Sequence, residues 1–180
     1  MNDQTPNLVQ SLIAYDPLTG LMTWKERGPE MFATRRAHSA WNARYAGKPA
    51  LDCDDGKGYR HGRIFRKHMF AHRAAWMIAH GEMPPERIDH INGDKSDNRI
   101  KNLRGVTNAE NGRNAKRSST NTSGVTGVCW VKRQQRYLAY IGSYQDREYL
   151  GTFADLESAV AARRAAEVKL GYHENHGRSA

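Results

Sequence analysis

The stretch from residue 87 to residue 111 reads RIDHINGDKSDNRIKNLRGVTNAEN, and it decides the fold that we expect for the centre of the chain. Residues 87–91 and 103–106 are short stretches that predict two strands. The turn-forming sequence Asn92-Gly93-Asp94 opens the loop between them. The sequence that follows, from Thr107 to Glu110, fits the capping box that begins a helix. The expected local order is therefore strand, loop, strand, helix.

Three polar side chains of this stretch could act together on a phosphodiester bond. Hydrolysis requires a group that deprotonates water and a cation that stabilises the leaving oxygen. A neutral histidine such as His90 can take the proton near neutral pH. The carboxylate of Asp89 and the amide oxygen of Asn111 are ligands that suit a hard divalent ion. Asp89 and His90 point to opposite faces of an ideal strand, so a strand end or a bulge would have to bring them to one site.

The same stretch resembles the HNH nuclease motif of phage and intron-encoded homing endonucleases, in which the third position is a histidine or an asparagine. His90, Asn102 and Asn111 stand at the three positions of that motif. The resemblance implies His90 as the general base, with Asp89 and Asn111 as metal ligands. It implies a structural role for Asn102, which would tie the loop to the hairpin, and a ββα-metal finger as the fold. Because Asn111 replaces a histidine of many members, we expect Mg²⁺ or Mn²⁺ in place of tightly held zinc.

The composition points to nucleic acid as the partner. The formal net charge of the 180 residues is +9, which implies an anionic partner. The longest apolar run, residues 74–79, is too short to span a bilayer, and residues 1–10 do not read as a signal peptide. The two cysteines form no C-x-x-C pair and no disulfide framework. We therefore expect a monomer in the cytoplasm of a bacterial host, encoded by a phage or mobile element, that binds double-stranded DNA, not a membrane, and needs no small-molecule cofactor.

The basic residues gather on both sides of the acidic centre. Between Asp55 and Glu82 there are six Lys/Arg, four His and no acid, and between Glu110 and Asp146 there are six Lys/Arg and no acid. A solvated face usually mixes both signs of charge. Two such segments favour phosphate-contacting surfaces around a cation site, although surface charge that only aids solubility is the alternative.

The last third of the chain predicts a small DNA-binding module. Residues 128–131, 137–141 and 148–153 read as strands, and residues 156–170 read as a helix that Gly171 ends. Its sequence, with GVCW, RYLAYI and YLGTF, resembles the Apetala-type DNA-binding domain of plant ethylene-response factors. The resemblance implies a sheet whose exposed face lies in the major groove. The candidate DNA contacts are the polar and aromatic residues of this sheet, namely Trp130, Lys132, Arg133, Arg136, Tyr140 and Arg147.

The fold class that we expect is α+β, a ββα-metal nuclease core plus a three-stranded antiparallel sheet with one packed helix. The predicted parts are an N-terminal strand and loop region (1–60), the nuclease core (61–114), a linker (115–124) and the DNA-binding domain (125–176). The function that we expect is metal-dependent cleavage of DNA, by nicking or double-strand cutting, at a preferred site. The alternative is a non-catalytic, sequence-specific DNA-binding protein, and an RNA-directed role is less favoured.

Overall fold

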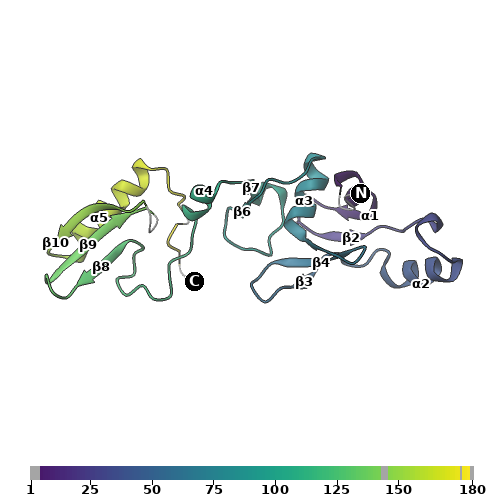
Figure 1. The fold of residues 1–180 in the computed structure, drawn as a ribbon, viewed down its shortest axis with the longest axis horizontal. Helices are drawn as coiled ribbons and strands as arrows, with labels where there is room; N and C mark the ends of the chain where they lie inside the picture. The colour runs from purple at the N-terminus through teal and green to yellow at the C-terminus, as the bar shows by residue number, and fades with distance from the viewer. Residues whose placement is uncertain (1–4, 143–145, 175, 179–180) are drawn as a thin grey trace. The chain divides into compact units, whose positions relative to one another are not determined.

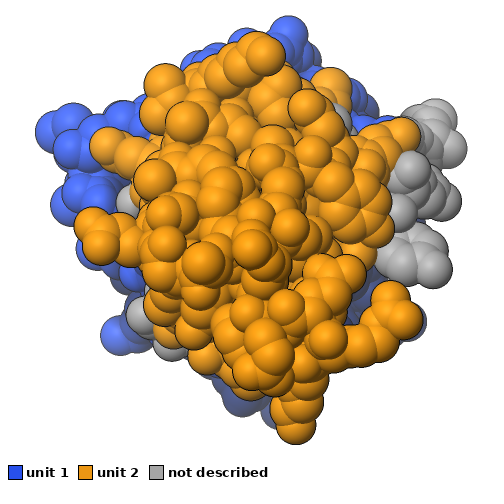
Figure 2. All heavy atoms as spheres, turned by 90° about the vertical axis from the view of Figure 1, so that its left-hand side faces the viewer, with its two compact units in different colours: residues 1–106 blue, residues 107–180 orange. Residues whose placement is uncertain are grey.

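The computed structural model describes residues 5–142, 146–174 and 176–178. The chain forms two compact units, residues 1–106 (unit 1) and 107–180 (unit 2), which Figure 2 draws in blue and orange. The sheets are small and antiparallel, so the mixed α and β character is confirmed. The domain limits drawn from the sequence remain predictions. No helix in the described ranges has the length and apolar character needed to cross a membrane.

Unit 1 combines short helices with three small antiparallel sheets (Figure 1). The sheets pair β1 with β2, order β3, β4 and β5 in sequence, and pair β6 with β7. Its elements are α1 (Pro6–Leu12), β1 (Ile13–Tyr15), β2 (Met22–Trp24), η1 (Pro29–Met31), α2 (Arg35–Tyr45), β3 (Cys53–Asp54), β4 (Arg60–Ile64), β5 (Lys67–Phe70), α3 (Ala71–His80), β6 (Ile88–His90), η2 (Ile100–Asn102) and β7 (Leu103–Gly105).

The core of unit 1 is formed by the apolar faces of its helices and strands. Leu12 on α1, Ile64 on β4 and Ala74 on α3 have no solvent exposure. Ala74, Met77 and Ile78 recur at helical spacing and form the face that α3 turns towards the core. The helix begins at Ala71, because Met69 and Phe70 pair with β4 as the end of β5. Gly81 ends it in the left-handed conformation, with φ +70°.

Helix α2 is the main difference from the sequence prediction. Residues 27–60 were expected to hold only loops and short strands, and that prediction was wrong for residues 35–45. The apolar spacing of an ordinary amphipathic helix is missing there, because the inward face of α2 is made of polar and aromatic side chains. Thr34 caps the helix, and its side chain accepts a hydrogen bond from the backbone N–H of Ala37.

Unit 2 contains the three-stranded antiparallel sheet and the packed helix that the sequence predicted. The strand order is β10-β9-β8, and α5 contacts all three strands. Val128, Ala139 and Ala159 are the buried centre of the contact between sheet and helix. The Asp155 side chain caps α5 by accepting from the Ser158 backbone N–H at 2.7 Å. The elements are α4 (Asn108–Gly112), β8 (Val128–Val131), β9 (Arg136–Ile141), β10 (Glu148–Phe153) and α5 (Leu156–Lys169).

Residues 113–117 pair with the C-terminal segment of the same unit. The backbone N–H of Arg117 donates to the carbonyl of Arg178, and that of Gly177 donates to the carbonyl of Ala115. The Arg178 guanidinium also donates to the Asn114 carbonyl at 2.7 Å. The start of the predicted linker is therefore tied into unit 2.

Candidate active site

The β6–β7 hairpin carries the adjacent residues Asp89 and His90 on opposite faces. Asp89 lies across from Arg104, and His90 lies across from Leu103. The Arg104 guanidinium donates two hydrogen bonds to Oδ2 of Asp89, at 3.2 Å from Nε and 2.9 Å from Nη2. One face of the hairpin therefore presents a carboxylate oriented by an arginine, and the other presents an imidazole that packs inward.

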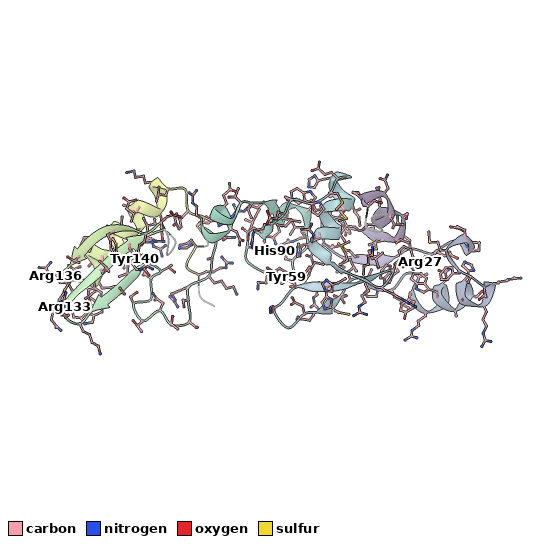
Figure 3. The ribbon with its side chains drawn as sticks, viewed as in Figure 1. Arg27, Tyr59, His90, Arg133, Arg136 and Tyr140 are labelled. Carbon is pink, nitrogen blue, oxygen red and sulfur yellow. The ribbon has the colours of Figure 1, made fainter. Side chains whose placement is uncertain are left out.

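His90 is buried within a cluster of rings, with 3% of its surface exposed. The centroid of its ring lies 5.9 Å from that of Tyr59 and 5.4 Å from that of His72. Figure 3 shows Tyr59 and His90 close together within unit 1. Burial lowers the pKa of His90, while the neighbouring Asn98 side chain and the charges of Asp89, Asp94 and Asp97 act in the opposite direction. The ring is therefore neutral near pH 7, the form that accepts a proton.

Asn102 holds the loop between the two strands. Its Oδ1 accepts from the backbone N–H of Asn92 at 3.0 Å, and its Nδ2 donates to the carbonyl of Asp97 at 2.8 Å. Its own backbone carbonyl accepts from Ile91 at 2.9 Å. Since Asn102 is only 6% exposed, these bonds satisfy groups that would otherwise lie buried without partners. These bonds hold the loop between the strands, and the role of Asn102 in the motif remains a prediction.

The acidic side chains of the loop are held by hydrogen bonds within the loop. Asp97 accepts from the Arg99 guanidinium and from the Asn92 amide, and the bond from Arg99 is the main cause of its lowered pKa. Asp94 accepts from the Ser96 hydroxyl at 2.7 Å, which lowers its pKa. Both carboxylates are therefore ionised at neutral pH, on the loop beside His90.

The N-terminal β1–β2 hairpin packs against the loop between β6 and β7. The Tyr15 hydroxyl donates to the carbonyl of Asn98 at 2.8 Å, and burial raises the pKa of Tyr15 to about 12. Gly20 lies so close that a Cβ there would fall 2.7 Å from the backbone N of Arg99. The turn at residues 16–20 thus fixes the backbone at Asn98, whose side chain acts on the pKa of His90.

Three residues near His90 were not singled out as site residues by the sequence. His72, on α3, is buried, and burial lowers its pKa to about 3. Arg104 could have been found from strand pairing, because the predicted hairpin places it near Asp89. Tyr59 lies about thirty residues upstream in a region with no clear period, so no sequence signal marked it.

Asn111 lies in the first turns of α4, in unit 2, and is exposed. The predicted capping box is present. The Thr107 N–H donates to the Glu110 carboxylate at 2.8 Å, and the Glu110 N–H donates to the Thr107 hydroxyl at 3.3 Å. The helix therefore begins where the sequence predicted. The ββα arrangement, which would join this helix to the hairpin of unit 1, remains a prediction.

The predicted DNA contacts of unit 2 do not all lie on one face of the sheet. Arg136 and Tyr140 alternate with the buried Ala139, so they lie on the face that α5 leaves uncovered. Trp130 pairs with Tyr137 at 4.7 Å between ring centroids, which places it on the face of α5, at the end of the sheet, with 40% of its surface exposed.

The remaining predicted contacts lie at the two turns of the sheet. Lys132 and Arg133 are exposed in the β8–β9 turn, and Arg133 and Arg136 lie at the same end of the sheet (Figure 3). The Arg147 guanidinium lies 4.1 Å above the ring of Tyr140. Tyr149 lies across from Tyr140 and is 65% exposed, an aromatic side chain on the uncovered face that the sequence prediction omitted.

The comparisons with known proteins identify the region around the hairpin. Residues 69–113 match the model of a family described as HNH endonuclease. This match supports a nuclease, a hydrolase that acts on DNA. It covers α3, the β6–β7 hairpin and α4, and therefore includes Asp89, His90, Asn102 and Asn111. Searches of curated proteins and of solved structures find no match to the chain.

Proposed function

We propose that the protein is a metal-dependent endonuclease that hydrolyses phosphodiester bonds of duplex DNA, with His90 as the general base. The observation that carries the proposal is the hairpin within the matched region. It carries a buried, neutral imidazole at the end of β6, with a carboxylate on the opposite face of the hairpin, next to a loop that the hydrogen bonds of Asn102 hold. General-base catalysis needs a proton acceptor of this kind, held in one orientation.

The chain's own residues would divide the work of the reaction. His90 accepts the proton of the attacking water at a ring nitrogen, and Tyr59 and His72 hold the plane of its ring. Arg104 keeps the Asp89 carboxylate oriented. We assign Asp89 and Asn111 as the residues that hold a divalent ion, which when bound would neutralise the charge on the leaving oxygen.

The donor chemistry fits a hard ion better than zinc. The two assigned ligands offer a carboxylate and an amide oxygen. No three His, Cys, Asp or Glu side chains come together as a metal-binding group in the described part of the chain. An ion held here would take most of its ligands from phosphate and water, as Mg²⁺ and Mn²⁺ do.

We further propose that unit 2 binds duplex DNA through the uncovered face and the turns of its sheet. The resemblance to Apetala-type domains supports this, and so do the exposed Arg136 and the two cations of the β8–β9 turn, Lys132 and Arg133. Tyr140 lies on the same uncovered face, and the Arg147 guanidinium lies against its ring at the other end of the sheet. Trp130 would then act from the edge of the sheet.

The experiment is cleavage of supercoiled plasmid by the purified protein with Mg²⁺ or Mn²⁺. Open-circle or linear product is expected, and His90→Ala should lower the rate by about 10²- to 10⁴-fold, the usual contribution of a general base. His80→Ala, at an exposed position at the end of α3, is the control and should cleave normally. Full activity of His90→Ala would refute the assignment of the base.

A second candidate function is DNA binding without catalysis, and one observation favours it. The Arg104 guanidinium already occupies Oδ2 of the proposed metal ligand Asp89. If that bond persists on DNA, the carboxylate is a structural partner of an arginine. Tight, salt-sensitive binding with no product under any divalent ion would support this candidate and contradict the first.

A further inference from the structure

We propose that the outward face of α2 is a further DNA-contacting surface, which lies in the major groove of the duplex. The inference rests on the proposed function, because it takes duplex DNA as the substrate. It concerns a helix that lies outside residues 69–113 and outside the sheet of unit 2. Figure 1 shows α2 set apart from α1 and α3 within unit 1.

The inward face of α2 is firmly anchored. Asn42 makes two hydrogen bonds with the backbone of Arg27: its Oδ1 accepts from the Arg27 N–H at 3.0 Å, and its Nδ2 donates to the Arg27 carbonyl at 2.9 Å. The ring of Trp41 meets that of Trp24 at 6.0 Å and that of Phe32 at 6.1 Å. The helix is thus held along one side only.

A buried arginine completes this anchor. Arg27 is 9% exposed, and its guanidinium carbon lies 3.8 Å from the ring centroid of Trp41, with Trp24 and Phe65 at 5.3 and 5.2 Å. Burial lowers the pKa of Arg27. Ring faces attract a cation of this kind. The position of Arg27 (Figure 3) therefore fixes α2 to the unit without using any side chain of its outward face.

The outward face combines small side chains with arginines. At 100° per residue, the packed residues His38, Trp41 and Asn42 lie on one side of the helix, and Arg36 lies near the centre of the other. Ser39, Ala40 and Ala43 surround Arg36, and all four are exposed. Small side chains allow the helix backbone to approach a surface closely.

The outward face of α2 is positively charged, which favours an anionic partner. Residues 31–51 contain four Lys/Arg and no Asp or Glu. Arg35, Arg36 and Arg44 take part in none of the ion pairs found among the described residues. Arg35 and Arg36 also lie in the first turn, where the helix dipole disfavours cations by about 0.3–1 kcal/mol each. Phosphate groups would offset that cost.

Duplex DNA matches the shape as well as the charge. A helix about 10–12 Å across fits the major groove, which is about 12 Å wide. Because the residues around Arg36 are small, the helix can enter the groove, and Arg35 and Arg44 at the two edges of the face can reach the phosphates on either side. An anionic membrane offers charge but no groove, so it gives the small residues no role.

The test measures equilibrium binding of a labelled duplex by fluorescence anisotropy, with every variant in the full-length His90→Ala background. Arg36→Glu is expected to weaken binding about tenfold, the loss of one charge-assisted contact in the groove. Ala43→Leu changes no charge but adds bulk, and it is expected to weaken binding about threefold or more. Lys169→Glu and Ala165→Leu make the same changes at exposed positions of α5 and should have no such effect.

Binding by Arg36→Glu and Ala43→Leu at the level of their matched controls would overturn the proposal. A loss in Arg36→Glu alone would also overturn the groove contact, because it would leave only a general effect of charge. Lack of cleavage by the wild-type protein refutes the endonuclease but leaves this binding result intact. Binding of the parent to anionic vesicles and not to duplex would overturn both proposals.

Discussion

The hairpin of unit 1 and the sheet of unit 2 use charge in opposite ways. In the hairpin and its loop two carboxylates are paired with arginines: Asp89 with Arg104, and Asp97 with Arg99. In the β8–β9 turn and on the uncovered strand, Lys132, Arg133 and Arg136 are exposed, and none is in an ion pair found among the described residues. Paired and buried groups fix geometry, while exposed cations offer attraction.

This difference assigns separate tasks to the two regions. A reacting group must be held to within a fraction of an ångström, which the hydrogen bonds of Asn102 and the ring contacts of His90 can do. A surface that binds the phosphate backbone needs charge more than precision. Changes in the hairpin should therefore act on fold and rate, and changes in the sheet should act on affinity and salt dependence.

The largest effect is expected from Asn102→Leu. The substitution removes both side-chain hydrogen bonds and leaves the Asn92 N–H and the Asp97 carbonyl without those partners. We expect the free energy of unfolding of unit 1 to fall by about 2–4 kcal/mol and cleavage to be lost. Urea denaturation and the plasmid assay measure the two effects. Gln134→Leu, at an exposed position of the β8–β9 turn, is the control, and an unchanged denaturation midpoint for Asn102→Leu would contradict the structural role.

The next effect is expected from Arg133→Ala combined with Arg136→Ala. Each lost phosphate contact should weaken DNA binding about tenfold and lower the slope of log affinity against log salt by about one. The rate of cleavage at saturating DNA should stay close to that of the wild type, because the hairpin is untouched. Anisotropy over a salt series and single-turnover cleavage separate affinity from rate. A fall in the single-turnover rate with unchanged affinity would contradict this assignment, because it would show that the sheet of unit 2 acts on the rate.

The sequence could predict those parts of the fold that local rules control. The capping box at Thr107, the strands of the hairpin and the three strands and helix of unit 2 all follow from residue spacing and turn chemistry. Helix α2 could not be predicted, since its packed face is polar and aromatic, and its anchor is Arg27, which lies eight residues before the helix begins.

The candidate site could be predicted only in part, because local rules do not reveal residues that meet through tertiary packing. Asp89, His90 and Asn102 stand in one motif, so the sequence shows them together. The ring cluster depends on Tyr59 and His72, which come from different elements and meet His90 only through tertiary packing. Arg104 is local, but its salt bridge to Asp89 depends on the strand register, which the sequence fixes less well than the strands themselves.

A smaller effect is expected from Gly20→Ala, with Gly47→Ala as its matched control. Both glycines have positive φ, +78° and +73°, so an alanine is strained by a similar amount, about 1 kcal/mol, at either position. At Gly47 nothing lies within 4 Å of the added Cβ, whereas at Gly20 it would meet the backbone of Asn98 and Arg99. We expect Gly20→Ala to lose about 1 kcal/mol more stability than Gly47→Ala and to lower the cleavage rate. Equal cleavage by the two variants would show that the turn does not position the loop of the hairpin.

The smallest effect concerns pH and also sets the hairpin region apart from the sheet. Burial lowers the pKa of His72 from 6.5 to about 3 in the folded protein, so the unfolded chain binds the proton more readily. Stability is therefore fully present above pH 6.5 and is lost as the pH falls, with about 1 kcal/mol lost between pH 7 and pH 5.5 from this residue. His90 has the same direction of shift and adds to the loss.

His72→Phe should remove the contribution of His72 to this loss. In urea denaturation, the stability of the variant should therefore fall less between pH 7 and pH 5.5 than that of the wild type. An identical fall in both proteins would mean that His72 is charged, or solvated, in the folded state, and the ring cluster around His90 would then have to be looser than its contacts indicate.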